Sequence, residues 1–237
     1  MSDSDKEETI VAISKQLDET SAGQMAATNL RAVIAMIPFV GGAFSTLATE
    51  LIPNWKLQRL NRFVAALKVD LEALGNRIDI QYLKKEEFGY IFEKTFRAVV
   101  LNYQDEKLSA LRNVLINSMV RTDIKQDVKE YLLHLTESLD TLHMRFLALL
   151  RNPSEYYRNK QLPDSPHGSM MTELRKCFPE LSDGTMQAVW NDLYNYGIVS
   201  VTPNLLGAGI SGIGSEALVR QLSEFGKLLV DFIGSPS

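Results

Sequence analysis

The chain has 237 residues, of which 45% are hydrophobic and 23% are charged, and its formal net charge is −4. A chain of this length and composition folds into one or two globular domains that bury a sizeable apolar core. The negative charge argues against a general nucleic-acid or anionic-membrane binder, because both depend on clustered lysine and arginine. Cys177 is the single cysteine, which excludes an internal disulfide and a paired-cysteine metal site.

The N-terminus, MSDSDKEETI, is acidic and polar, so it lacks the basic start and apolar core of a signal peptide. This composition favours a cytoplasmic, bacterial-type protein. Ile10, Ile13 and Leu17 then recur at helical spacing and predict a first amphipathic helix that ends at about Thr20.

Residues 27–52 are the most apolar part of the chain, with no charge between Arg31 and Glu50. Pro38 and the glycine pair 41–42 interrupt this part and predict a kinked or split helix, an apolar hairpin. The simpler interpretation is a buried core that amphipathic helices cover. The alternative is conditional insertion into a membrane, because residues 32–51 would span about 30 Å as one helix. The candidate membrane segment consists of Ile34, Ile37, Pro38, Phe39, Val40, Gly41, Gly42, Phe44, Leu47 and Leu51.

The clearest periodicity runs from Trp55 to Ile78, where apolar residues alternate in steps of three and four. Such an a/d seam keeps one narrow stripe against a partner helix, either within the chain or in a second copy. The seam consists of Leu57, Leu60, Val64, Leu67, Leu71, Leu74 and Ile78.

Three further helices are predicted before residue 151. The first has its apolar face over 88–103, and Asp105 is a candidate cap for the second. Asp123 and Gln126 resemble a capping box for a long third helix that reaches Leu149. Since no strand pattern intervenes, residues 1–151 predict an antiparallel multi-helix bundle.

The composition changes after this bundle. Residues 152–168 contain three prolines and no apolar periodicity, which predicts a linker. Residues 169–237 then give two helices, the β-branched run 198–201, a glycine-rich loop and a closing segment. This order predicts a small α/β, winged-helix-like domain, so the predicted fold class is mostly α with a helical bundle and a winged-helix-like domain.

Two parts of the chain resemble known families. The closing segment LSEFGKLLVDFI resembles the end of bacterial winged-helix domains at Leu222, Ser223, Gly226, Phe232 and Ile233. The phrase IPFVGG at 37–42, followed by Ile52-Pro53 and the leucine-rich helix, resembles a widespread group of uncharacterised bacterial helical proteins. It is also similar to HeLo-type cell-death bundle domains. This second resemblance implies a bundle that can contact membranes, and it brings no catalytic residues.

Motifs for catalysis or cofactor binding are weak. Residues 207–212 match GxGxxG, but a dinucleotide site needs a parallel βαβ unit for which the remaining chain has no room. His134, His143 and His167 lack metal-ligand spacing, and the chain has no ExxH motif. No nucleophile–histidine arrangement can be defended from spacing. We therefore predict a non-enzymatic protein without cofactor, metal or small-molecule substrate.

The second domain does not have the charge of a DNA-binding module. From residue 166 onward the chain has four basic and seven acidic residues, and the candidate recognition helix 185–196 contains no lysine or arginine. The leading hypothesis is an interaction or regulatory protein that binds a protein partner or itself through Trp190, Tyr194 and Tyr196. Two alternatives stay open: a membrane-perturbing bacterial defence effector that uses residues 34–51, and a winged-helix DNA-binding regulator.

Overall fold

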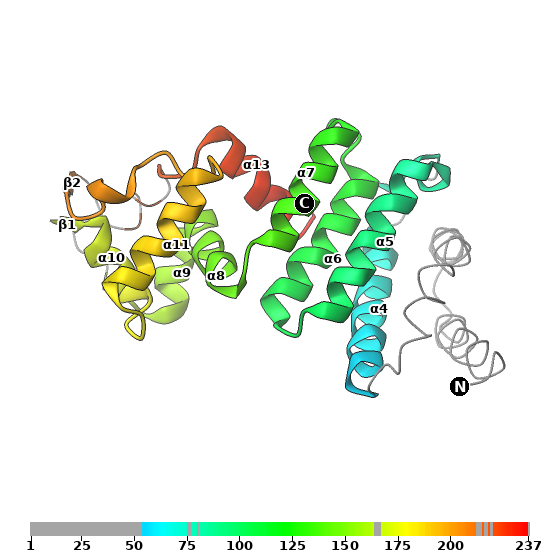
Figure 1. Ribbon diagram of the computed structural model, residues 1–237, viewed down its shortest axis with the longest axis horizontal. Coiled ribbons are helices and arrows are strands. Elements are labelled where there is room, and N and C mark those ends of the chain that lie inside the picture. Colours follow the sequence, from blue (N-terminus) through cyan, green and yellow to red (C-terminus); the bar gives the residue numbers. More distant parts are fainter. Residues whose placement is uncertain are drawn as a thin grey trace. The chain divides into compact units, whose positions relative to one another are not determined.

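The computed structural model describes residues 54–74, 77–79, 81–163, 167–211, 215, 218 and 220–236. Over these residues the chain is mostly α-helical, as predicted (Figure 1). It divides into two compact units, of which unit 1 extends to Ser138 and unit 2 covers Leu139–Ser235. The apolar segment 27–52, with all candidate membrane residues, lies outside the described residues.

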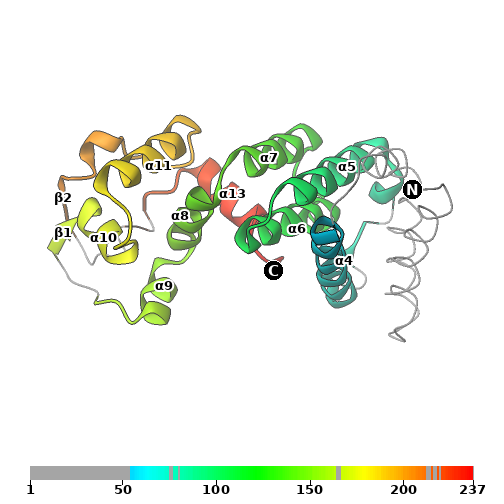
Figure 2. The ribbon, with the colours of Figure 1, turned by 60° about the horizontal axis from the view of Figure 1, so that its bottom comes forward.

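The described part of unit 1 is a helical bundle. Helices that follow one another in the sequence lie side by side and run antiparallel (Figures 1 and 2). Helix α5 contacts three other helices, and its phenylalanines form the centre of the core. The rings of Phe92 and Phe96 stack at 4.3 Å, and Phe63 meets Phe96 edge-on at 5.5 Å. The elements are α4 (Asn54–Leu74), η2 (Tyr82–Lys84), α5 (Glu86–Leu101), α6 (Asp105–Val120) and α7 (Gln126–Ser138).

The a/d seam of α4 is closed inside unit 1. Leu60, Leu67, Leu71 and Leu74 are all buried, and α4 packs against α5 and α6. Burial of a leucine side chain contributes about 1.5–3 kcal/mol, so this stripe stabilises the bundle substantially. The described part of the seam therefore serves intramolecular packing.

Helices α6 and α7 are joined by two buried lysines. Lys107, near the start of α6, donates from Nζ to the Glu137 carbonyl at the end of α7 (3.0 Å). Lys129, near the start of α7, donates to the Ser118 carbonyl at the end of α6 (2.8 Å). The last carbonyls of a helix lack intrahelical partners and carry partial negative charge, so each lysine satisfies the C-terminal end of the other helix.

Unit 2 combines helices with one small antiparallel sheet. Strand β1 pairs with β2 so that Gly168 lies opposite Ile210, and a separate bridge joins Val199 to Leu222. In the core, the rings of Phe146 and Phe178 stack at 4.6 Å. The elements are α8 (Thr141–Arg151), α9 (Pro153–Lys160), β1 (His167–Ser169), α10 (Met170–Cys177), α11 (Asp183–Asn195), η3 (Pro203–Leu205), β2 (Gly209–Ser211) and α13 (Glu224–Phe232).

The boundary between the two units lies between Ser138 and Leu139, before the boundary predicted at residue 151. The single helix expected over 123–149 is interrupted, because the Asp140 carboxylate accepts hydrogen bonds from the backbone amides of Leu142 and His143 and starts α8. Residues 139–151 belong to unit 2.

The expected linker 152–168 contains α9. Asn152 caps this helix by accepting from the Glu155 amide, and Pro153 occupies its first turn, where the missing N–H costs nothing. A proline that marks a linker by composition here begins a helix.

The two expected capping residues in unit 1, Asp105 and Asp123, do not occupy the N-cap positions of α6 and α7. Helix α6 begins at Asp105, but its preceding residue Gln104 makes no side-chain capping bond. Asp123 forms a two-point ion pair with Arg121, at 2.8 Å for each contact, and α7 begins only at Gln126. The carboxylate of Asp123 therefore fixes the connection that precedes α7.

Candidate interaction surface on helix α11

Helix α11 is positioned by its cap and by one apolar stripe. The Ser182 hydroxyl accepts from the Thr185 amide (3.1 Å), which satisfies one of the free donors at the helix start. The helix ends at Asn195, and Gly197, just beyond the C-cap Tyr196, has a φ of 69° in the left-handed region that favours glycine. Its buried stripe consists of Met186, Val189, Trp190 and Leu193.

The three predicted partner-binding residues fall into two environments. Trp190 is fully buried, and its indole Nε1–H donates to the Val201 carbonyl (2.8 Å). Tyr194 and Tyr196 are 37% and 38% exposed, so they lie at the surface of the last turn. The helical spacing of Trp190 with Met186 and Leu193 is the sequence signal that marks it as a core residue.

The outer face of α11 is exposed and uncharged. We define it by its residues at spacings of three and four: Gly184, Gln187, Ala188, Asn191 and Asn195, all of them exposed. Each amide side chain both donates and accepts hydrogen bonds. Leu205 of η3, an element in contact with α11, is also exposed. The face therefore offers hydrogen-bonding amides and one alanine methyl group, without charge.

The carboxylates that flank this face have partners. Asp183 forms a two-point ion pair with Arg175, at 2.9 and 2.5 Å. The hydrogen bonds from Arg175 hold the pKa of Asp183 below its usual value. Both side chains are exposed, so this ion pair contributes little to the stability of unit 2. Its main effect is that the opposite charges of Asp183 and Arg175 cancel.

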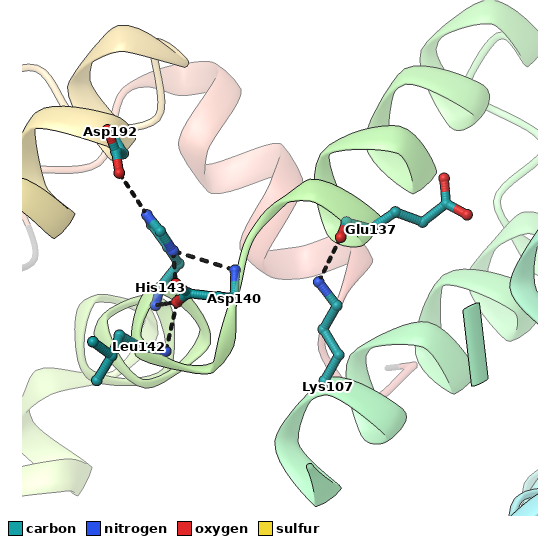
Figure 3. A network of polar contacts seen from close by, with 6 residues as sticks. All are labelled: Lys107, Glu137, Asp140, Leu142, His143 and Asp192. Carbon is teal, nitrogen blue, oxygen red and sulfur yellow. Dashed lines mark hydrogen bonds and ion pairs between the residues drawn. The ribbon is translucent and has the colours of Figure 1, made fainter. Parts of the chain in front are cut away.

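His143 of α8 lies between two carboxylates, one of them on α11 (Figure 3). Its Nδ1 is 2.8 Å from Asp140 Oδ1, and its Nε2 is 3.4 Å from Asp192 Oδ2. Burial alone would raise the pKa of Asp140, but hydrogen bonds from the backbone and ring of His143 outweigh burial and lower it. These contacts connect α11 to the first turn of α8. Figure 3 also shows the Lys107–Glu137 bond of unit 1.

A second polar cluster lies in the interior of unit 2. Glu173 is fully buried and accepts from the Tyr157 hydroxyl (2.5 Å) and from Lys176 Nζ (2.8 and 3.0 Å). Burial and the bond to Glu173 raise the pKa of Tyr157. Burial also raises the pKa of Cys177 to about 11, which keeps that thiol protonated and unreactive. The cluster has its charges and donors paired, as a structural network requires.

The remaining motifs do not assemble into a site. Strand β2 of the GxGxxG region is antiparallel to β1, whereas a dinucleotide site uses parallel strands. His134 and His143 belong to different helices, α7 and α8. Among the described residues, no group of three or more His, Cys, Asp or Glu side chains could hold a metal ion. Within the same residues, no helix combines the length and apolarity that crossing a bilayer requires.

No family model, no curated protein and no solved structure matches the chain. The functional proposal is therefore based on the sequence and structure of this chain alone.

Proposed function

We propose that unit 2 is a winged-helix-like module that binds a protein partner through the outer face of α11. The whole chain is then a non-enzymatic interaction or regulatory protein. One observation carries this proposal: the outer face of α11 is exposed, uncharged and bordered by the half-exposed Tyr194 and Tyr196.

The order of elements in unit 2 supports the winged-helix comparison. A short strand, β1, precedes two successive helices, α10 and α11, and an antiparallel strand partner follows them. In a winged helix the second of two such helices presents its outer face to the ligand. By this analogy α11 is the presenting helix.

The charges of unit 2 favour a protein over DNA. Residues 139–235 contain eight basic and ten acidic residues, a net charge of −2. Four of the basic side chains are in ion pairs, namely Arg145, Arg175, Lys176 and Lys227. DNA binding requires that basic residues neutralise phosphates. Protein interfaces instead have few charges at their centre and are enriched in aromatic residues.

The test is in-cell photo-crosslinking with a photoreactive amino acid in place of Asn191. We expect one or a few discrete protein adducts. The matched control replaces Asn159, an exposed amide on α9 of the same unit, and is expected to give none. Adducts of equal yield from both positions, or sub-micromolar binding of duplex DNA at physiological salt, would overturn the proposal.

A further inference from the structure

The structure of unit 1 carries an apolar surface at one end of the bundle. Leu101 and Tyr103 are 75% and 71% exposed, the highest values for large apolar side chains among the described residues, and Trp55 is 53% exposed. Single exposed apolar residues are ordinary, but a group of them marks a contact surface. We call Trp55, Leu101 and Tyr103 the end patch.

Arg59 joins the two sides of the end patch. Its guanidinium lies 4.9 Å from the centre of the Trp55 ring and donates to the Val100 carbonyl at 3.1 Å. Trp55 therefore lies next to the end of α5, where Leu101 is the last residue. In Figure 1 the start of α4 and the end of α5 are on the same side of unit 1.

From this arrangement we infer that the end patch binds the surface of a lipid bilayer that contains anionic lipid. Tryptophan and tyrosine are the residues enriched at membrane–water interfaces, because their rings are apolar and carry one polar group. Leu101 adds purely apolar area. The surface is on unit 1 and does not depend on the partner proposed for α11.

The position of the end patch in the sequence supports a lipid occupant over another protein. The chain from Ala32 to Thr49 has no charged residue, and Leu51 is only four residues before Trp55. Four residues extend at most about 14 Å. Any contact of this uncharged stretch with a bilayer therefore brings the end patch to the same lipid surface.

The charges beside Trp55 have the sign that anionic lipid requires. Lys56 is half-buried and Arg62 is exposed within the first nine residues of α4, whereas Arg59 is buried. The first acidic residue of this helix is Asp70. On the α5 side, Arg97 is paired with Glu93, and Asp105 and Glu106 begin α6. Basic residues near an anionic surface each contribute to binding, so α4 is the side that faces the lipid headgroups.

The test is co-sedimentation of the full chain with vesicles of phosphatidylethanolamine and phosphatidylglycerol. We expect binding by the native chain and a roughly ten- to hundredfold weaker partition for the double variant Leu101→Glu/Tyr103→Glu, because two apolar side chains no longer enter the interface. The control is Val69→Glu, which adds one of the two negative charges of the double variant at a 64% exposed apolar position of α4 and is expected to bind normally.

Tryptophan fluorescence gives an independent readout. The chain has two tryptophans, and Trp190 is buried in unit 2, so a blue shift on vesicle binding reports Trp55. We expect the shift in the native chain and in Val69→Glu, and none in Trp55→Phe, which lacks the reporting indole. Absence of vesicle binding, equal partition of the double variant, or self-association through the end patch without lipid would each overturn the inference.

Discussion

Gly226 lies so close to Ile198 that a methyl group on its Cα would be 2.0 Å from the Ile198 carbonyl oxygen. The neighbouring Ser223 reinforces this contact. Its amide donates to the same carbonyl (3.0 Å), and its hydroxyl donates to the Gly197 carbonyl (2.6 Å) and accepts from the Gly226 amide (2.8 Å). The start of α13 is thus held against the chain that follows α11. The serine and glycine of the LSEFG phrase each have a physical role in that contact.

Gly226→Ala is expected to destabilise unit 2 by about 1–3 kcal/mol, because the obstructing atom is backbone and cannot rotate away. The higher helix propensity of alanine offsets part of this cost. Denaturant unfolding measures the difference. The control is Gly89→Ala in α5, where no atom lies within 4 Å and alanine is expected to stabilise by about 0.5–1 kcal/mol. Equal effects at both positions would refute the close contact.

Asp140→Ala is expected to cost about 1 kcal/mol, since two amides at the start of α8 lose their acceptor. The pKa of Asp140 is lowered in the folded chain, so its contribution is fully present above about pH 4 and is lost as the pH falls through the folded value. Thermal unfolding of the native chain and of Asp140→Asn across acidic pH measures this dependence. An identical pH dependence in both proteins would count against the contribution of this carboxylate.

Lys129→Met is expected to destabilise unit 1 by about 1–3 kcal/mol, because the Ser118 carbonyl at the end of α6 loses a buried donor. The ammonium also lies 4.3 Å from the centre of the Tyr82 ring. Lys125→Met, at an exposed position just before α7, is the control and is expected to change stability by less than about 0.5 kcal/mol. If Lys129→Met proved as stable as the control, the capping role would be excluded.

Trp190 and Tyr194 are expected to respond oppositely to substitution. Trp190→Phe removes the donor to the Val201 carbonyl and leaves space in the core. The free energy of unfolding should therefore fall by about 1–3 kcal/mol. Tyr194→Ala should leave stability nearly unchanged and weaken partner binding. Thermal unfolding of the two variants, side by side, distinguishes a core residue from a surface residue.

Periodicity predicted the helical class and the α4 stripe, because long amphipathic segments repeat the same signal many times. The break between α7 and α8 was missed, because the capping role of Asp140 is invisible inside an otherwise continuous apolar pattern. Strand β1 is three residues long and too short for an alternation to appear. Composition alone also could not distinguish Trp190 as a core residue from Tyr194 as a surface residue, because aromatic side chains serve in both places.

The end patch was not predicted from the sequence either. Tyr103 falls at the end of the apolar face expected over 88–103, and Trp55 begins the pattern of α4, so neither residue is exceptional in the sequence. Their exposure depends on where α4 and α5 meet, which is a tertiary property. The hydrogen bond from Arg59 to the Val100 carbonyl, which brings the two ends together, spans 41 positions of the chain.

The most direct test of the proposed function is calorimetric titration of the protein captured at Asn191 into the full-length native chain and into Asn191→Arg. The account predicts that Asn191→Arg folds normally and binds at least about tenfold more weakly, because a charge enters an uncharged interface. Unchanged affinity in a folded Asn191→Arg protein would contradict the assignment of the outer face of α11 as the partner-binding surface.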